Sequence, residues 1–290
     1  MRTVGPPRDP WELRLQRVAL AATVYVGFHA QPRFSEQPFP LGVSTLIDFS
    51  CLARPAAAAW VEWALLASIV LYIAGRAMVL ATGVMLAAWV AAGALASSQG
   101  ALGHKTQLLA MVLIGQLFAY VQASRARGAN GAHGLAVYYS QEVIAAGYIL
   151  AGLTKIVLSR GRWIEQIPLV VTEIAKTHGQ TYYSTLQQGV IERGDAIATV
   201  ILAHPNLTRV LFGCGGLLEI SAGVALLGRR SAFAVGIGLL AMHWAIAELM
   251  LIEFPENEAL LAIYFVNVPF LLVIGVRRLT GFGGQRRSGA

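Results

Sequence analysis

Long apolar runs recur along the whole chain and restrict its fold more than any other feature. A helix that crosses a bilayer needs about 20 mostly apolar residues. The runs are long and lack period-two alternation, which excludes a β-barrel. The sequence therefore predicts an all-α, polytopic transmembrane helix bundle of about eight spans, at residues 14–30, 56–75, 77–98, 104–122, 135–158, 207–227, 231–251 and 258–276.

Composition supports the membrane assignment. Apolar residues make up 56% of the 290 residues and charged residues 13%, whereas soluble domains are about one quarter charged. The net charge of +7 comes from charges scattered in ones and twos between apolar runs. Nucleic-acid binding requires such charges on one face. We therefore expect the lipid bilayer, and no nucleic acid, as a partner.

Arginines mark every second connection between the predicted spans, and short basic connections lie on the cytoplasmic side. The connection after the seventh span is instead acidic. This alternation predicts a protein of the cell membrane with both termini cytoplasmic, namely an N-terminal segment 1–13 and a tail 279–290. The arginines are Arg2, Arg8, Arg14, Arg17, Arg76, Arg125, Arg127, Arg229, Arg230, Arg277, Arg278, Arg286 and Arg287.

Segment 159–206 is the one long region without a predicted span, and it falls on the outer side in this topology. It contains two mildly amphipathic stretches, Ile164–Thr177 and Thr185–Ala203. Long loops are usually functional or disordered, and this one is too aromatic and aliphatic for disorder. We expect interfacial helices here, within a single transmembrane domain at 14–278.

Two of the charged residues inside predicted spans stand out, because a charge within a membrane span costs about 2.5–3.5 kcal/mol or more. Lys155 shares a helix face with Gln141, Tyr148 and Gly152, at about 100° per residue. It either snorkels to the interface or is a dry, neutral amine that acts as a base. If desolvation keeps the amine neutral, no carboxylate should lie within ion-pair distance of it. Glu219 is expected to face the bundle and to hydrogen-bond another helix.

Two histidines complete the set of candidate residues. His104 opens the fourth span on the same side as Lys155, either as a solvated helix-end residue or as a partner of the lysine. His243 lies in the seventh span, five residues before Glu248. Residues five apart do not share a helix face well, so no metal site is predicted from this pair.

The motif Tyr148-Ile-Leu-Ala-Gly-Leu-Thr-Lys155, followed by Trp163, resembles a signature of the vitamin K-dependent gamma-carboxylase-like superfamily. Bacterial members of that superfamily are HTTM-type (horizontally transferred transmembrane) proteins, and DoxX-type proteins are looser relatives. Two further blocks resemble the same family: Gly216-Leu-Leu-Glu219-Ile-Ser, and His243 with Phe254. The resemblance covers roughly residues 10–278.

The resemblance implies roles for these residues. Lys155 would be the base toward a vitamin K-like quinol, which then adds O₂ and leaves as an epoxide, and His104 would support that step. His243, Tyr148 and Trp163 would line the substrate site. Gly152 would leave room for a flat ring against the helix. The quinol would be a co-substrate, and no covalently bound cofactor is expected.

Three functions stay open at this point. The first is a quinol-oxidising or carboxylase-like membrane enzyme. The second is a non-catalytic HTTM- or DoxX-like membrane module, a scaffold or maturation partner of another protein such as a small exported protein or peptide. A transporter is the third and weaker interpretation, because inverted repeats and broken spans in matching halves are not evident.

Overall fold

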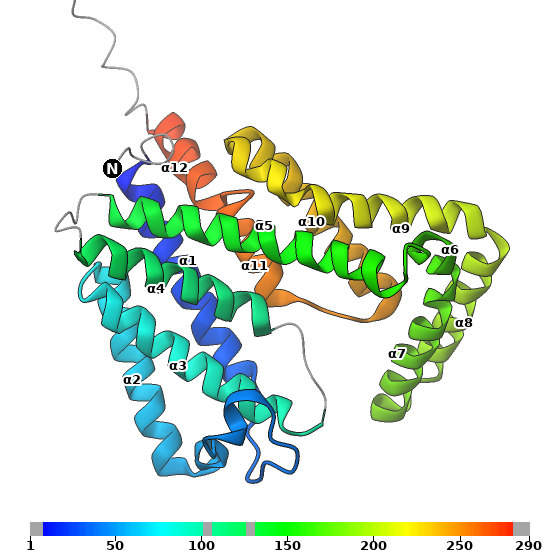
Figure 1. Cartoon of the computed structure of the whole chain (residues 1–290), viewed down its shortest axis with the longest axis horizontal. Helices are drawn as coiled ribbons and strands as arrows, with labels where there is room; N and C mark the ends of the chain where they lie inside the picture. Colours follow the sequence, from blue (N-terminus) through cyan, green and yellow to red (C-terminus); the bar gives the residue numbers. More distant parts are fainter. Residues whose placement is uncertain (1–7, 101–105, 126–130, 281–290) are drawn as a thin grey trace, which may run out of the picture. The chain divides into compact units, whose positions relative to one another are not determined.

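The computed structural model describes residues 8–100, 106–125 and 131–280, and within these ranges the chain is helical with no strand (Figure 1). The predicted all-α class is confirmed. The longer helices are α1 (Pro10–Ala30), α2 (Pro55–Ala74), α3 (Met78–Ser97), α4 (Gln107–Arg125), α5 (Ala132–Leu158), α7 (Val170–Thr185), α8 (Gln188–Ala203), α9 (Pro205–Ile220), α10 (Arg229–Met250), α11 (Pro255–Tyr264) and α12 (Val268–Leu279). Short helical segments are η1 (Gly42–Thr45), η2 (Ser50–Ala53), α6 (Trp163–Gln166), η4 (Ile167–Leu169) and η5 (Ser221–Leu227).

Six of the described helical segments are long and apolar enough to cross a membrane: α2, α3, α4, α5, α9 with η5, and α10. The pair α11 and α12 makes a seventh span if its two helices, bent by 49°, are counted together. The architecture is therefore that of a multi-pass helical membrane protein. The expected count of eight is wrong, and the difference is α1.

Polar residues explain why α1 does not meet the criterion for a span. Its first half carries Glu12, Arg14, Gln16 and Arg17. Glu12 and Gln16 are buried, and α1 packs against α2, α3 and α12. The N-terminal half of this helix therefore supplies polar groups to a helical core.

The break between α11 and α12 falls at Asn267. This residue has φ +57°, a left-handed conformation that asparagine tolerates better than most residues. Its side chain caps α12 by accepting a hydrogen bond from the Phe270 amide, and Pro269 follows within the first turn. The single span predicted at 258–276 is thus divided into two helices in the structure.

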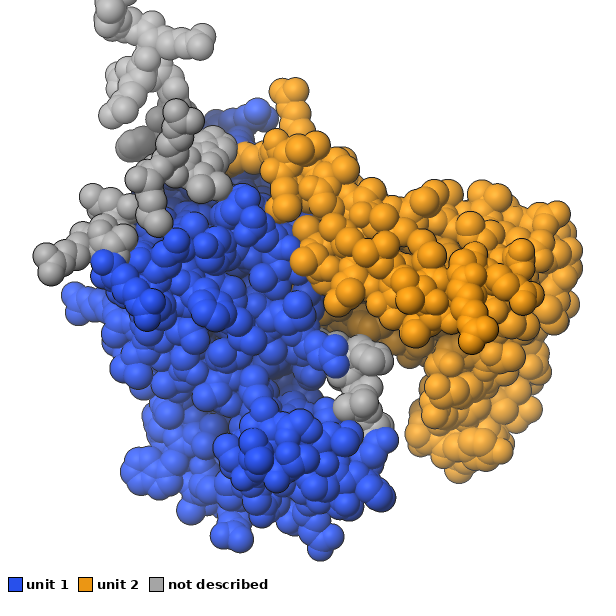
Figure 2. Space-filling model, in the orientation of Figure 1, with its two compact units in different colours: residues 1–143, 262–290 blue, residues 144–261 orange. Residues whose placement is uncertain are grey.

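The chain forms two compact units (Figure 2). Unit 1 contains residues 1–143 and 262–290, and unit 2 contains residues 144–261. In unit 1, buried amides connect the helices. Asn267 donates to Glu12 (2.8 Å) and accepts from Gln16 (3.1 Å). Gln116 accepts from the Tyr72 hydroxyl (2.6 Å) and donates to the Tyr264 hydroxyl (2.7 Å). Such internal pairing is what an apolar surrounding requires of polar groups.

Unit 2 contains the expected outer-side segment. Helices α7 and α8 run side by side as a hairpin (Figure 1), and the chain turns at Leu186, which has φ +57°. The hairpin is close-packed at Gly194, because a Cβ there would lie 2.8 Å from the His178 ring. Helix α8 begins within three residues of the start of the second expected stretch and ends with it at Ala203, but the first stretch is divided between α6, η4 and α7.

Candidate functional site

The polar face of α5 within unit 2 carries the residues that sequence reasoning singled out. Tyr148 is buried and Lys155 is half-exposed. Gln141, expected on the same face, belongs to unit 1, where it donates to the Tyr264 carbonyl (2.7 Å) and accepts from Arg8 (3.0 Å). The candidate site therefore consists of Tyr148, Lys155 and the residues of unit 2 that contact them.

Lys155 forms an ion pair with Glu219 of α9. The glutamate side chain is 7% exposed and the lysine side chain 39% exposed. The expectation that Glu219 hydrogen-bonds a polar group of another helix is confirmed. The condition for an amine kept neutral by desolvation, that no carboxylate lie within ion-pair distance, is not met, so Lys155 is not an isolated, desolvated amine.

Gly152 explains why the carboxylate reaches the lysine. A Cβ at this position would lie 2.7 Å from Ile220 Cγ1 and 3.3 Å from Glu219 Cβ. The missing side chain therefore lets α9 approach α5 closely, one turn before Lys155. The same contact fills the space beside Gly152, so the expectation of room for a flat ring at this glycine is wrong.

Trp163, on α6, adds an aromatic surface to the pair. The ammonium of Lys155 lies 5.8 Å from the centre of the Trp163 ring, within the range of a cation–π contact. Gly216 of α9 allows the ring to sit there, because a Cβ at Gly216 would lie 2.6 Å from Trp163 Cζ3. The lysine, the glutamate and the tryptophan therefore form one cluster, and Gly152 and Gly216 leave the space that its close packing needs.

A second cluster lies along the same helix face. The Tyr148 hydroxyl and Nε2 of His243, on α10, share a 2.6 Å hydrogen bond. The His243 ring also lies 5.0 Å from the ring of Phe254, centre to centre. Nδ1 of His243 is buried and has no partner within the described part of the chain. The structure thus brings Tyr148, His243 and Phe254 together.

His104, the other predicted catalytic residue, lies outside the described residues. Glu248 does not join His243 but pairs with Arg193 of α8 (2.7 Å). In the described ranges, no group of three or more histidine, cysteine or acidic side chains is arranged to hold a metal ion.

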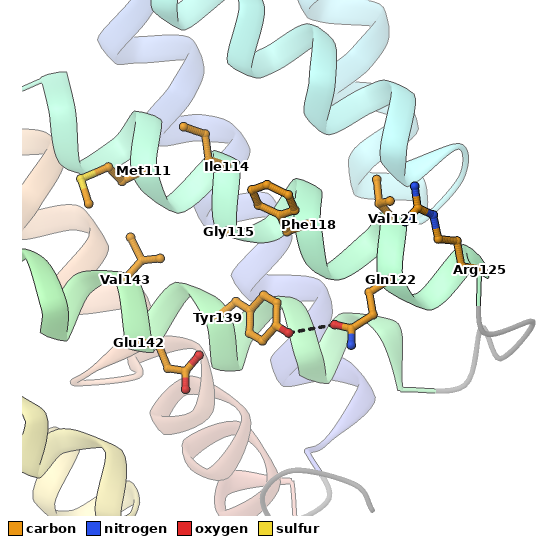
Figure 3. Close-up of a pocket in the computed structure, with 10 residues that line it drawn as sticks. All are labelled: Met111, Ile114, Gly115, Phe118, Val121, Gln122, Arg125, Tyr139, Glu142 and Val143. Carbon is orange, nitrogen blue, oxygen red and sulfur yellow. Dashed lines mark hydrogen bonds between the residues drawn. The ribbon is translucent and has the colours of Figure 1, made fainter. Parts of the chain in front are cut away.

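Sequence reasoning missed a groove in unit 1, between α4 and the first half of α5 (Figure 3). Its volume is about 590 Å³. The groove cannot be seen in the sequence because it depends on how two helices separated by a connection pack at Gly115, where a Cβ would lie 3.1 Å from Val143. It is lined by Met111, Ile114, Gly115, Phe118, Val121, Gln122, Arg125, Tyr139, Glu142 and Val143.

Comparison with protein-family models, with curated proteins and with solved structures finds no match. The chemistry open to the site therefore follows from its own residues.

The cluster around Lys155 can bind and move a proton. It contains a cationic donor with an exposed end, a buried carboxylate acceptor in direct contact with that donor, and an aromatic surface beside both. The Tyr148–His243 pair is a second donor–acceptor couple, although both of its side chains are buried. Lys155 and Trp163, and not the buried Tyr148 and His243, are therefore the residues that a small molecule can reach from the protein surface.

Proposed function

We propose that this multi-pass membrane protein is an enzyme that takes a proton from a lipid-soluble quinol, with Lys155 as the base and Glu219 as its partner. The observation that carries the proposal is the ion pair between a half-exposed lysine and a buried glutamate, placed against the Trp163 ring. The resemblance of the Tyr148–Lys155 motif to the carboxylase-like superfamily supplies the class of substrate.

The pairing sets the order of proton movements in this proposal. An ammonium group has no free electron pair, so Lys155 cannot accept a proton while it is charged. Glu219 is in hydrogen-bond contact and can take that proton first. The neutral amine then accepts the proton of the quinol hydroxyl, as a positioned general base does. The reduced quinol reacts with O₂ to give the quinone epoxide and water, which balances the oxidation.

Trp163 and Tyr148 have supporting functions in this scheme. The Trp163 ring offers a flat surface on which a quinol ring can stack beside the ammonium group. Tyr148, on the same face of α5, positions His243 of α10 through their hydrogen bond. The resemblance implies that His104 supports the same step.

Turnover of a vitamin K-type hydroquinone by the purified full-length chain in lipid nanodiscs tests the proposal. Epoxide formation under O₂ would be followed by mass spectrometry. We expect Lys155→Arg and Glu219→Gln each to lower the rate at least about 100-fold, the usual contribution of a positioned base, because arginine keeps its proton and glutamine cannot accept one. Lys176→Arg, an exposed lysine paired with Glu173 on α7, is the matched control and should keep the wild-type rate. Full activity of Lys155→Arg would exclude the base.

A structural observation favours a second candidate, a non-catalytic scaffold or maturation partner. Gly152 and Gly216 pack α5, α6 and α9 so closely that the ion pair can be explained as a contact between helices alone. In that case the wild-type chain forms no epoxide, and a small exported protein copurifies with it from native membranes. Lys155→Arg, which keeps the charge, should then leave that complex intact.

A further inference from the structure

We propose that the groove between α4 and α5 in unit 1 binds one anionic phospholipid, with its phosphate at Arg125 and an acyl chain along the apolar wall. Figure 3 shows Met111 and Ile114 toward one end of the groove and Gln122 and Arg125 at the other. The groove therefore has an apolar part and a polar end, like the molecule it is proposed to bind.

The apolar part is exposed in a manner that suits lipid. The Phe118 side chain is 65% exposed, and Ile114 and Met111 are about 40% exposed (40% and 39%). All three belong to α4, which is long and apolar enough to cross a membrane. A cleft in such a wall is filled by an acyl chain, because the bilayer provides no water for it.

The polar end presents two side chains with hydrogen-bond donors, Gln122 and Arg125. Gln122 accepts from the Tyr139 hydroxyl through Oε1 (2.8 Å), which leaves its amide N–H groups for a ligand. Arg125 follows three residues later on the same helix face and has no ion-pair or hydrogen-bond partner among the residues that the structure describes. A guanidinium group beside amide donors matches a phosphate, whose oxygens only accept.

The remaining acid of the groove lies away from this end. Glu142 is three residues beyond Tyr139 on α5, at the level where Val143 faces Gly115, and in Figure 3 its carboxylate points away from α4. Gly115 and Arg125 are ten residues apart, about 15 Å along a helix. That length is about one leaflet of the hydrocarbon core. Basic sites between transmembrane helices on the cytoplasmic side are where anionic head groups bind.

Native mass spectrometry of the full chain tests the proposal by comparing phosphatidylglycerol with phosphatidylcholine of the same acyl chains. We expect the wild type to bind phosphatidylglycerol more tightly, and Arg125→Gln to lower that preference about fivefold, as one basic side chain near the head groups contributes. Arg125→Lys should retain most of the preference. Arg76→Gln, at the end of α2 and outside the groove, is the matched control and should change nothing.

Met111→Trp tests the acyl part, because the larger side chain fills the groove, and it should weaken both lipids. Gln122→Leu removes the second donor. If Arg125→Gln cannot be purified in folded form, the binding of the two lipids to Gln122→Leu is compared instead. Equal binding of the two lipids by the wild type overturns the proposal, as does an equal loss in Arg76→Gln. A change of oligomeric state in Met111→Trp without loss of lipid would instead assign the groove to a second copy of the chain.

Discussion

Glu219 of α9 pairs with Lys155 of α5, and the two side chains differ strongly in exposure, at 7% for the acid and 39% for the lysine. The buried partner depends on the pair more than the half-exposed one. Removal of the lysine strands a carboxylate inside unit 2, whereas removal of the glutamate leaves an ammonium group that can still reach outward.

Stability should therefore respond unequally to the two single substitutions. We expect Lys155→Met to lower the unfolding free energy by about 1–3 kcal/mol, less than the 3–5 kcal/mol of a fully buried pair because the lysine is half-exposed. Glu219→Gln should cost less. The double variant Lys155→Met/Glu219→Gln should lose less stability than the sum of the two single variants. Thermal unfolding of the four proteins in one detergent measures this, and additive losses would contradict the coupling.

Two glycines on α9 provide a matched test of the close helix contact. Gly216 meets the Trp163 ring, whereas a Cβ added at Gly213 would have no atom within 4 Å. We expect Gly216→Ala to destabilise the protein by about 1–3 kcal/mol through overpacking. Gly213→Ala should be neutral or stabilising by up to about 1 kcal/mol, because alanine favours helix. Equal melting temperatures for the two variants would argue against the tryptophan position.

Asn267 should show separate effects of its backbone and its side chain. Asn267→Ala loses the hydrogen bonds to Glu12, Gln16 and the Phe270 amide, and it also places alanine at φ +57°. Asn267→Gly loses the same bonds but tolerates the backbone conformation. We therefore expect both variants to unfold at lower temperature, and the alanine variant to lose about 1 kcal/mol more. The reverse order would exclude the left-handed conformation.

The Tyr148–His243 hydrogen bond should matter for stability whatever the protein's activity. Tyr148→Phe leaves both nitrogens of a buried histidine without a partner, which costs about 1–3 kcal/mol. His243→Phe should cost less in the Tyr148→Phe background than in the wild type, because the two residues form one interaction. A double-mutant cycle by thermal unfolding measures the coupling. A coupling energy near zero would contradict the hydrogen bond between Tyr148 and His243.

Topology can be resolved by reporter fusions at three positions. Fusions after Arg127 and after Glu256 are expected on opposite sides, because α5, α9 with η5, and α10 lie between them. A fusion after Asp48 tests whether α1 crosses the membrane. With a cytoplasmic N-terminus, a cytoplasmic reporter at Asp48 means that α1 does not cross, and an outer reporter means that it does. Arg127 and Glu256 on the same side would contradict the order of spans.

The sequence predicted the helical class and most spans because long apolar runs are a local property. It misplaced α1 and the 258–276 span for a common reason. Asn267 forms hydrogen bonds with Glu12 and with Gln16, across 255 and 251 positions of the chain. Hydropathy averaged over about 20 residues does not detect contacts between distant parts of the chain. The polar residues of α1 were therefore interpreted as the interfacial end of a span, and the break at Asn267 was not predicted.

The candidate site was predictable in its members but not in their geometry. Lys155 and Glu219 stood out because a charge in an apolar run needs a reason. Their pairing depends on the close approach at Gly152, which only the packing of α9 against α5 reveals. The groove beside Arg125 had no sequence signal of its own, since its wall is ordinary apolar helix.

Unit 1 is assembled from both ends of the chain, with all of unit 2 inserted between its parts. Glu12 and Gln16, near the beginning, receive their contacts from Asn267, near the end. During synthesis the ribosome therefore makes every residue of unit 2 before the last piece of unit 1 exists. A nascent chain that stops before residue 267 therefore lacks the hydrogen bonds that Asn267 forms with Glu12 and Gln16. Completion of the last helix thus adds hydrogen bonds to the first helix that residues made earlier do not supply.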